Sequence, residues 1–300
     1  MPAGPTTKAE IDFAVERFLA ESRYTLQERN GVVKSIIRNQ TLPENEGPSV
    51  YIPKFGQVTT YALTEGVDMT QAQQITDTGM TITPAEFGAQ VVLTDMMLMT
   101  VRDEFMSVAS RILSDSFDRQ QDQTLCDDFD NFSIALGSAG TAMHNGHVMA
   151  AEASIKYNGP ANSSAGRGGE PGPGVVHVVH TPAGFHSVRK GLSGAVQAVG
   201  AATEVQPPDV KDFSETFRVG SVICHTDINI SKDTSDDAKG GALVPDAMIL
   251  VTLGGGASVE KERDASLRGW ELNYVGRWAR GEYDDNWGRE MLFDSILPTS

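Results

Sequence analysis

The stretch VTTYALTEGVDMTQAQQITDTGMTITPAEFGAQVVLTD, residues 58–95, is the part of the sequence that best indicates the fold. It contains no lysine or arginine but has five carboxylates, Glu65, Asp68, Asp77, Glu86 and Asp95. Both of its ends alternate between apolar and polar residues, as strands do, and its middle is polar without a two-residue turn signature. The pattern predicts a long hairpin whose arms are joined by a broad loop.

The predicted hairpin has few apolar residues to bury on its own. Tyr61 and Leu63 share one face of the first arm, and Met80 and Ile82 share one face of the second arm, which continues to Leu93. Because an isolated two-stranded ribbon is only marginally stable in water, this hairpin needs another surface to lie on.

The composition excludes several classes of protein. The 300 residues carry a formal net charge of −16, which opposes binding to nucleic acid because lysine and arginine supply most of that affinity. Cys126 and Cys224 are too few for a disulfide framework. Neither a secretory signal nor an apolar run of the roughly 18 residues that span a membrane is visible. We therefore expect a reduced, cytosolic chain with a sizeable core and no membrane partner.

Two segments have the periodicity of helices. Residues 6–30 place apolar side chains at helical spacing between a threonine N-cap and a terminal Asn-Gly, and a proline- and glycine-punctuated linker follows. This predicts a tethered N-terminal arm. From Thr94 to Phe129, an uninterrupted pattern predicts a helix of roughly 33 residues, about 50 Å long. The alternative is an ordinary core helix that breaks near Asp115.

The rest of the chain predicts a compact α/β domain and a returning strand. Residues 175–253 contain apolar strands and a helix that Pro182 opens, after a glycine-rich loop. Residues 269–288 alternate, which predicts a strand with one buried face formed by Trp270, Leu272, Tyr274 and Trp278. The alternative is that these aromatic side chains form a base-stacking platform, which the acidic residues around them oppose.

No catalytic, cofactor-binding or metal-binding pattern is visible. His144 and His147 have a spacing that can share a metal on a helix, but no third ligand follows nearby. His177 and His180 fall on opposite faces of a strand. The remaining candidates lack residues that their motifs require. Asp233, Asp236 and Asp237 lack the ligand spacing of a calcium-binding EF-hand loop, and Ser193 in GLSGA lacks the last glycine of a G-x-S-x-G nucleophile motif. The segments GRGGEPG and LGGGAS lack the final glycine of the dinucleotide-binding motif. We therefore predict a protein that is not an enzyme and uses no cofactor or metal.

The order of these elements resembles the major capsid proteins of tailed bacteriophages, which have the Hong Kong 97-type fold. The resemblance covers residues 50–296. It rests on LTEGVD, on VTTYAL with MTITPAEFGAQVVLTD running into RILSDSFDRQQDQTL, and on VVHVVHTPAGFHSVRKGL, FRVGSVICHTDINIS and VEKERDASLRGWELNYVGRWARGEYDD. It implies an α+β capsid fold and a structural protein of the virion.

The resemblance also implies a domain organisation. The expected parts are an N-terminal arm (1–49), an extended hairpin called the E-loop (50–94), a peripheral or P domain that begins with a long spine helix (95–160), an axial or A domain (161–253), and returning strands of the P domain (254–300). No lysine lies between Phe55 and Val101, so the lysine–asparagine crosslink of some family members is not expected.

Partners follow from the same resemblance. The subunit would assemble with itself into hexamers and pentamers of an icosahedral shell around double-stranded phage DNA, in the host cytoplasm. Scaffolding, portal and decoration proteins are expected as further partners, and contact with DNA is expected to be weak. The hairpin would lie on a neighbouring P domain through Tyr61, Leu63, Met80, Ile82 and the carboxylates Glu65, Asp68 and Asp77. The basic residues expected to face these carboxylates are Arg102, Arg111, Arg119, Arg263 and Arg268.

Two other functions remain open from the sequence. An encapsulin-type nanocompartment has the same fold and would enclose a protein cargo instead of DNA. A monomeric or dimeric α/β enzyme would need a pocket lined with titratable residues.

Overall fold

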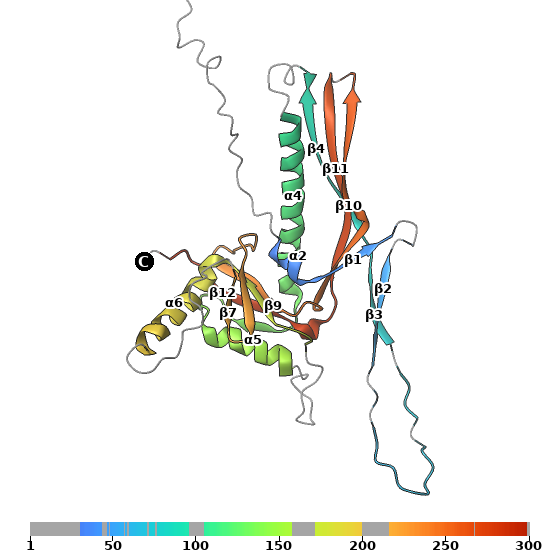
Figure 1. Ribbon diagram of the computed structural model, residues 1–300, viewed down its shortest axis with the longest axis vertical. Coiled ribbons are helices and arrows are strands. Elements are labelled where there is room, and N and C mark those ends of the chain that lie inside the picture. Colours follow the sequence, from blue (N-terminus) through green and yellow to red (C-terminus); the bar gives the residue numbers. More distant parts are fainter. Residues whose placement is uncertain are drawn as a thin grey trace, which may run out of the picture.

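The computed structural model describes residues 31–43, 47, 49–56, 58, 60–70, 72–75, 77–95, 105–157, 172–199, 216–266 and 268–298, with only the backbone for 105–108, 192–199 and 255–256. A four-stranded sheet, a six-stranded sheet and a two-stranded ribbon combine with helices, so the chain has an α+β fold. Figure 1 shows the four-stranded sheet rising at the top, the six-stranded sheet below it, and the ribbon projecting downward. Among the helices described, none is long and apolar enough to cross a membrane.

The four-stranded sheet is built around two long strands, β10 (Met248–Asp264) and β11 (Gly269–Glu282), which pair antiparallel. Strand β4 (Ala85–Thr94) pairs antiparallel with β11. Strand β1 (Arg38–Leu42) pairs in parallel with β10 and completes the order β1-β10-β11-β4. We call these four strands the long sheet.

Helix α4 (Phe105–Asp127) packs along β11, and a glycine permits this close approach. A Cβ atom at Gly276 would lie 2.2 Å from the ring of Phe117, so a side chain does not fit there. The Phe117 ring also packs on Tyr274, with 5.0 Å between the ring centroids. The helix is unbroken at Asp115, so the alternative of a break there is wrong. Residues 96–104, where the helix was predicted to begin, lie outside the described residues.

The aromatic face of β11 belongs to the core, as the alternation predicts. Leu272 is fully buried, and Trp278 is 2 % exposed. The Trp278 ring stacks on Phe87 of β4, with 4.5 Å between the ring centroids. This confirms a strand with one buried face and leaves Trp278 unable to act as a base-stacking platform.

The six-stranded sheet has the order β5-β12-β9-β6-β8-β7. Its strands are β5 (Ala135–Gly137), β6 (His177–His180), β7 (Thr216–Val219), β8 (Val222–Thr226), β9 (Asp237–Leu243) and β12 (Gly288–Asp294). Helices α5 (Asn145–Tyr157) and α6 (Pro182–Val199) and the 3-10 helices η2 (Asp128–Asn131) and η3 (Asp285–Trp287) accompany it. The main hydrophobic core lies between this sheet, α5, α6 and the end of α4, and its largest members include Phe129, Phe185 and Phe293, all fully buried.

The hairpin differs from its prediction at both ends. Its strands are β2 (Val50–Phe55) and β3 (Asp77–Ile82), so Tyr61 and Leu63 lie in the loop and not in the first arm. The second arm ends before Pro84, which cannot donate a ladder hydrogen bond, and the following strand β4 pairs with β11 instead. The predicted range 50–94 therefore combines a ribbon with one strand of the long sheet.

The N-terminal segment that the structure describes is part of the body. Helix α2 (Val32–Ile36) buries Val33 and Ile36 in the main core, and β1 pairs with β10. The prediction of a tethered arm over 1–49 is therefore wrong for residues 32–42. The helix predicted over residues 6–30 lies outside the described residues.

The residues of the two sheets do not follow the residue ranges predicted for the P and A domains. Strand β5 and helix α5, expected in the P domain, accompany the six-stranded sheet, and β12 joins it from the end of the chain. The segment FRVGSVICHT forms two strands around a turn at Gly220, whose φ is 63°. The segment LGGGAS is an irregular part of β10, where the pairing register shifts between Thr252 and Ala257.

Candidate functional site

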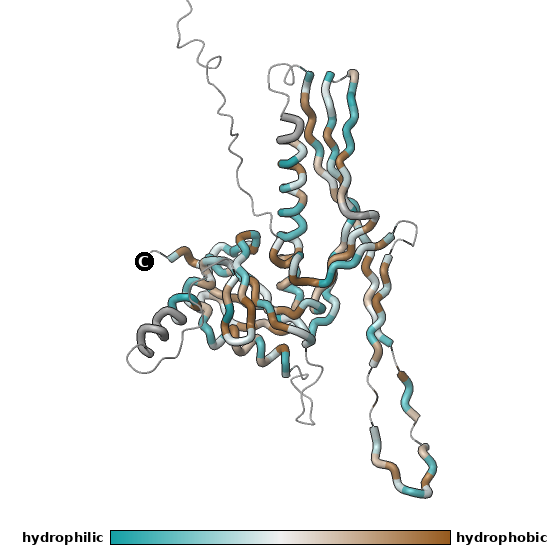
Figure 2. The backbone as a smooth tube through the Cα atoms, viewed as in Figure 1, coloured by the Kyte–Doolittle hydropathy of each residue, from teal (hydrophilic) through white to brown (hydrophobic). Residues whose placement is uncertain are grey.

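The ribbon and its loop expose apolar side chains. Eight large apolar residues in this region are between 53 % and 72 % exposed, namely Tyr51, Phe55, Val58, Tyr61, Leu63, Val67, Met69 and Ile75. Figure 2 shows hydrophobic segments along the projecting loop, away from both sheets. A group of exposed apolar side chains on one projecting element marks an interaction surface. We call residues 56–76 the projecting loop.

The projecting loop encloses an open space. Its two sides line a concavity of about 660 Å³ to which Tyr61, Leu63, Val67 and Met69 contribute. Because burial of apolar surface is favourable, a partner that fills this concavity would stabilise the loop in its observed shape.

The carboxylates near the projecting loop have no cationic partner among the residues that the structure describes. Glu65 and Asp68 are exposed and form no ion pair with another described residue. Asp77, at the start of β3, accepts a hydrogen bond from the hydroxyl of Tyr51, with 3.4 Å between the oxygens. The acidic end of the ribbon is therefore not neutralised by the part of the subunit that the structure describes.

The two later carboxylates of the quoted stretch do have partners. Glu86 pairs with Arg277 across β4 and β11 at 3.3 Å. Asp95 pairs with Arg263 at 3.2 Å. These ion pairs lie within one subunit and stabilise the long sheet, each by at most about 1 kcal/mol because the groups are partly exposed.

The predicted basic partners lie far from the projecting loop within one chain. Arg263 and Arg268 flank the turn between β10 and β11, Arg111 is in the first part of α4, and Arg119 is further along the same helix. Figure 1 places that turn and the start of α4 at the opposite end of the molecule from the loop. Arg102 lies outside the described residues. The loop can therefore meet Arg111, Arg263 or Arg268 only on another copy of the chain.

The base of the ribbon packs on its own subunit. Ile82 is 4 % exposed and lies in a small hydrophobic cluster with Ile249 and Val251, and Met80 packs against the same cluster. These two residues were expected to contact a neighbour, but the structure places them at the anchor point of the ribbon. Of the four apolar residues named from the sequence, Tyr61 and Leu63 remain exposed.

An ion pair also fixes the ribbon to the body. Lys54 of β2 hydrogen-bonds Asp284, whose side chain is 4 % exposed, and the Lys54 ammonium lies 5.6 Å from the centroid of the Trp287 ring. Asp284 also caps η3 by accepting from the N–H of Asn286 at 3.1 Å. The sequence did not reveal this pair because its members are far apart along the chain.

We expect Lys54→Met to destabilise the junction between ribbon and body. The substitution keeps the aliphatic stem but leaves the buried carboxylate of Asp284 without its cation, which should lower the free energy of unfolding by about 1–2 kcal/mol. Urea denaturation checks this value, and proteolysis in the projecting loop should become faster. Lys261→Met, which removes an exposed lysine of β10 away from the ribbon, serves as the control. Equal effects of the two substitutions would contradict an anchoring role for Lys54.

The histidine candidates make ring contacts with one another and with the core. The rings of His144 and His147 stack with centroids 5.7 Å apart. His177 and His180 point to opposite faces of β6, as predicted: His177 Nδ1 lies 3.0 Å from Nε2 of His225, whereas His180 is fully buried beside Phe293. Burial lowers the pKa of His180 to about 4, so this side chain is neutral at physiological pH.

The other candidates have structural roles or lie outside the described residues. Asp233 Oδ1 accepts from the N–H groups of Ser235 and Asp237, at 2.8 and 2.9 Å, and so shapes the turn before β9. Asp237 accepts from the N–H of Gly140 at 2.7 Å. The side chain of Ser193 lies outside the described residues.

Comparison with known proteins identifies the fold. No family model and no curated protein matches the sequence. The capsid of the cyanophage P-SCSP1u matches the structure over 97 % of this chain and 96 % of its own, with a TM-score of 0.68 at 12 % identity. The acid-stable capsid of the Helicobacter pylori bacteriophage KHP30 matches over 94 % and 95 %, with a TM-score of 0.71 at 9 % identity. The capsid of the cyanophage Pam1 matches over 98 % and 99 %, with a TM-score of 0.61 at 12 % identity. The chain therefore has the α+β fold of phage capsid proteins over nearly its whole length.

Proposed function

We propose that this chain is the major capsid subunit of a tailed phage and that it assembles into the icosahedral head that encloses the DNA. The observation that carries the proposal is the projecting loop, which is anchored at its base but exposes, at its far end, apolar side chains and carboxylates that pair with no cation of the described residues. Such a surface does not stabilise a monomeric protein, whereas a shell subunit can bury it against a neighbouring subunit. The role is structural and not enzymatic.

The domain names of the family apply to this chain with adjusted limits. The ribbon with its loop, residues 50–82, corresponds to the E-loop, and the long sheet with α4 corresponds to the P domain and its spine helix. The six-stranded sheet with α5 and α6 corresponds to the A domain. In this proposal the E-loop of one subunit lies on the P domain of the next, with its carboxylates toward Arg111, Arg263 or Arg268.

The partners follow from the shell. The subunit forms hexamers and pentamers in the virion, after assembly in the host cytoplasm, and meets scaffolding, portal and decoration proteins there. The net charge of −16 keeps contact with the packaged DNA weak, because like charges repel. An encapsulin-type shell is the second candidate. Electron micrographs of the expressed chain, followed by analysis of the particle contents for DNA or a protein cargo, distinguish the two.

Reversing the charges near the projecting loop should weaken assembly without unfolding the subunit. We expect the triple substitution Glu65→Lys, Asp68→Lys and Asp77→Lys to leave circular dichroism unchanged, because all three side chains are exposed. Exposed ion pairs contribute about 0–1 kcal/mol each, so the concentration needed for assembly should rise at least about tenfold. Sedimentation velocity measures this concentration, and the difference should shrink in high salt.

The matched control replaces the same residues by Gln, Asn and Asn. This neutral variant should fall between the natural chain and the lysine variant, since it removes attraction without adding repulsion. Identical assembly of all three proteins would show that these carboxylates face no cation.

A further inference from the structure

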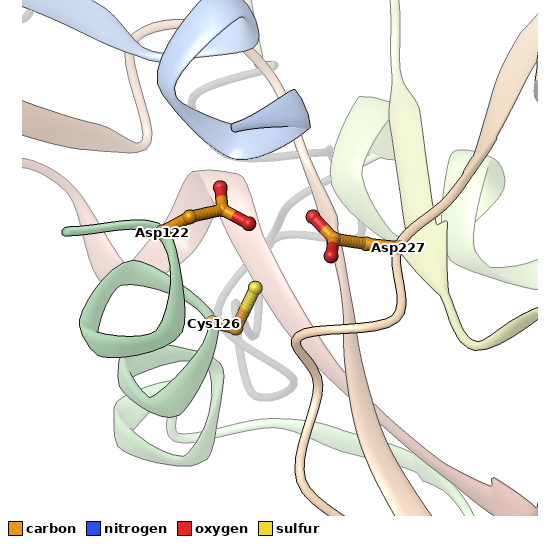
Figure 3. A group of neighbouring side chains, drawn as sticks. All are labelled: Asp122, Cys126 and Asp227. Carbon is orange, nitrogen blue, oxygen red and sulfur yellow. The ribbon is translucent and has the colours of Figure 1, made fainter. Parts of the chain in front are cut away.

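Asp122, Cys126 and Asp227 bring three possible metal ligands together in the core. One carboxylate oxygen from each aspartate and the Sγ atom of Cys126 all lie within 4.8 Å of one another. Figure 3 shows the two carboxylates facing each other with the thiol directed between them. The three residues are 1 %, 3 % and 0 % exposed, in the order named. We call them the Asp-Cys-Asp cluster.

The cluster joins two parts of the fold. Asp122 and Cys126 are four residues apart on α4 and therefore share one face of the helix. Asp227 follows β8, and its N–H donates to the carbonyl of His180 at 3.0 Å, which fixes the end of that strand. Helix α2 covers the cluster, and a Cβ atom at Gly31 would lie only 2.9 Å from Oδ1 of Asp122. The cluster is thus closed from solvent between the spine helix and the six-stranded sheet.

Asn229 orients both carboxylates. Its side-chain amide donates to Oδ2 of Asp122 at 2.8 Å, and its backbone N–H donates to Oδ1 of Asp227 at 2.8 Å. The second oxygen of Asp227, Oδ2, is buried and accepts no hydrogen bond from a described nitrogen, hydroxyl or thiol group, and the carboxyl group of Asp122 can hydrogen-bond Asp227 only when one of the two aspartates is protonated. A buried oxygen of this kind is costly unless another group satisfies it.

The two carboxylates of the cluster influence each other's charge because they are buried and close together. Burial, and then the neighbouring Asp122, raise the pKa of Asp227 to about 7, and the N–H of Asn229 opposes them. Burial and the nearby carboxylates also raise the pKa of the Cys126 thiol. Two buried carboxylates in contact cannot both stay ionised without compensation by a proton or a cation.

We propose that the Asp-Cys-Asp cluster binds a divalent transition-metal ion such as Zn²⁺ and thereby ties α4 to the six-stranded sheet. Thiolate and carboxylate are both ligands of Zn²⁺, whereas Mg²⁺ and Ca²⁺ prefer sites built from oxygen alone. On binding, the Cys126 thiol and the carboxylate pair both release their protons to solvent, so that the thiolate and both carboxylates coordinate as anions. A proton shared between the two aspartates would also satisfy the oxygens, and Cys126 would then serve only as a member of the main hydrophobic core.

Metal titration of the reduced, chelator-treated full chain tests the proposal. Co²⁺ is the probe, because its bond to a thiolate produces a charge-transfer absorption band, and Zn²⁺ is then added to displace it. We expect one Co²⁺ per chain, displacement by Zn²⁺, and a melting temperature higher by about 5 °C when Zn²⁺ is saturating. Cys126→Ala should abolish the band. Cys224→Ala is the matched control, because Cys224 is the other buried cysteine and lies outside the cluster.

These measurements distinguish a metal ion bound by the cluster from a proton shared between its two aspartates. Asp227→Asn should weaken Co²⁺ binding at least about tenfold if the cluster binds metal. The natural chain decides the question even if a variant fails to fold. A folded natural chain without a thiolate band and without stabilisation by Zn²⁺ would overturn the proposal, as would a band that survives in Cys126→Ala.

Discussion

Replacing Leu63, Val67 and Met69 together by serine is expected to abolish particle assembly and to leave the free subunit folded. These side chains are 67 %, 67 % and 72 % exposed, so the subunit does not depend on them for its own core. Full burial of one such side chain contributes about 1.5–3 kcal/mol. Losing three of them should weaken each contact between subunits by about a thousandfold or more. Sedimentation velocity and negative-stain micrographs measure assembly, and thermal melting measures the fold.

The control keeps the same positions apolar. Leu63→Met, Val67→Ile and Met69→Leu change shape but not polarity, and adaptable apolar side chains of similar size are usually tolerated. This variant should assemble. If the serine variant loses its fold, the loop belongs to the core of its own subunit. If the serine variant forms particles at the natural concentration, the loop contacts no neighbour.

Trp278→Ala is expected to lower the free energy of unfolding of the subunit by about 3–5 kcal/mol. Trp278 is 2 % exposed and stacks on Phe87, so its removal opens a large cavity between β4 and β11 at the point where the long sheet meets η2. Urea denaturation of the unassembled subunit measures the loss.

Trp270 provides the matched control for this substitution. It lies on the same face of the same strand, but it is half-buried and its ring is 6.0 Å from the Arg263 guanidinium. Trp270→Ala should cost about 1 kcal/mol, because less apolar surface leaves water there. Similar small losses for both tryptophans would contradict a structural role for this face.

Local periodicity predicted the elements that have one buried face. The alternation of β11 is clear in the sequence because each second side chain faces α4, with Leu272 and Trp278 in the core. Apolar residues at helical spacing likewise predicted the continuous helix through Asp115. Pairing between distant segments was not visible: nothing in residues 38–42 indicates that they lie beside Ile249 to Leu253.

The projecting loop was only partly predictable. The sequence showed that residues 58–95 contain no lysine or arginine and that the hairpin has few apolar residues to bury, which predicted that it needs another surface. Tyr61 and Leu63 are exposed, as a contact surface requires. Ile82 shows the limit of this reasoning, because alternation identifies a buried face without saying which chain buries it. The Asp-Cys-Asp cluster was missed for a related reason. Asp122 and Cys126 share a helical face in the sequence, but Asp227 reaches them only through the fold.

Hydrogen–deuterium exchange of the projecting loop, compared between free subunits and assembled particles, tests the central claim most directly. We expect backbone amides in residues 60–75 to exchange rapidly in the free subunit, since those that the structure describes form no strand, and to become strongly protected in particles when a neighbouring subunit covers them. Amides of β11 should be protected in both states and serve as the internal reference. Particles in which residues 60–75 exchange as fast as in the free subunit would contradict the proposal that this loop joins one subunit to the next.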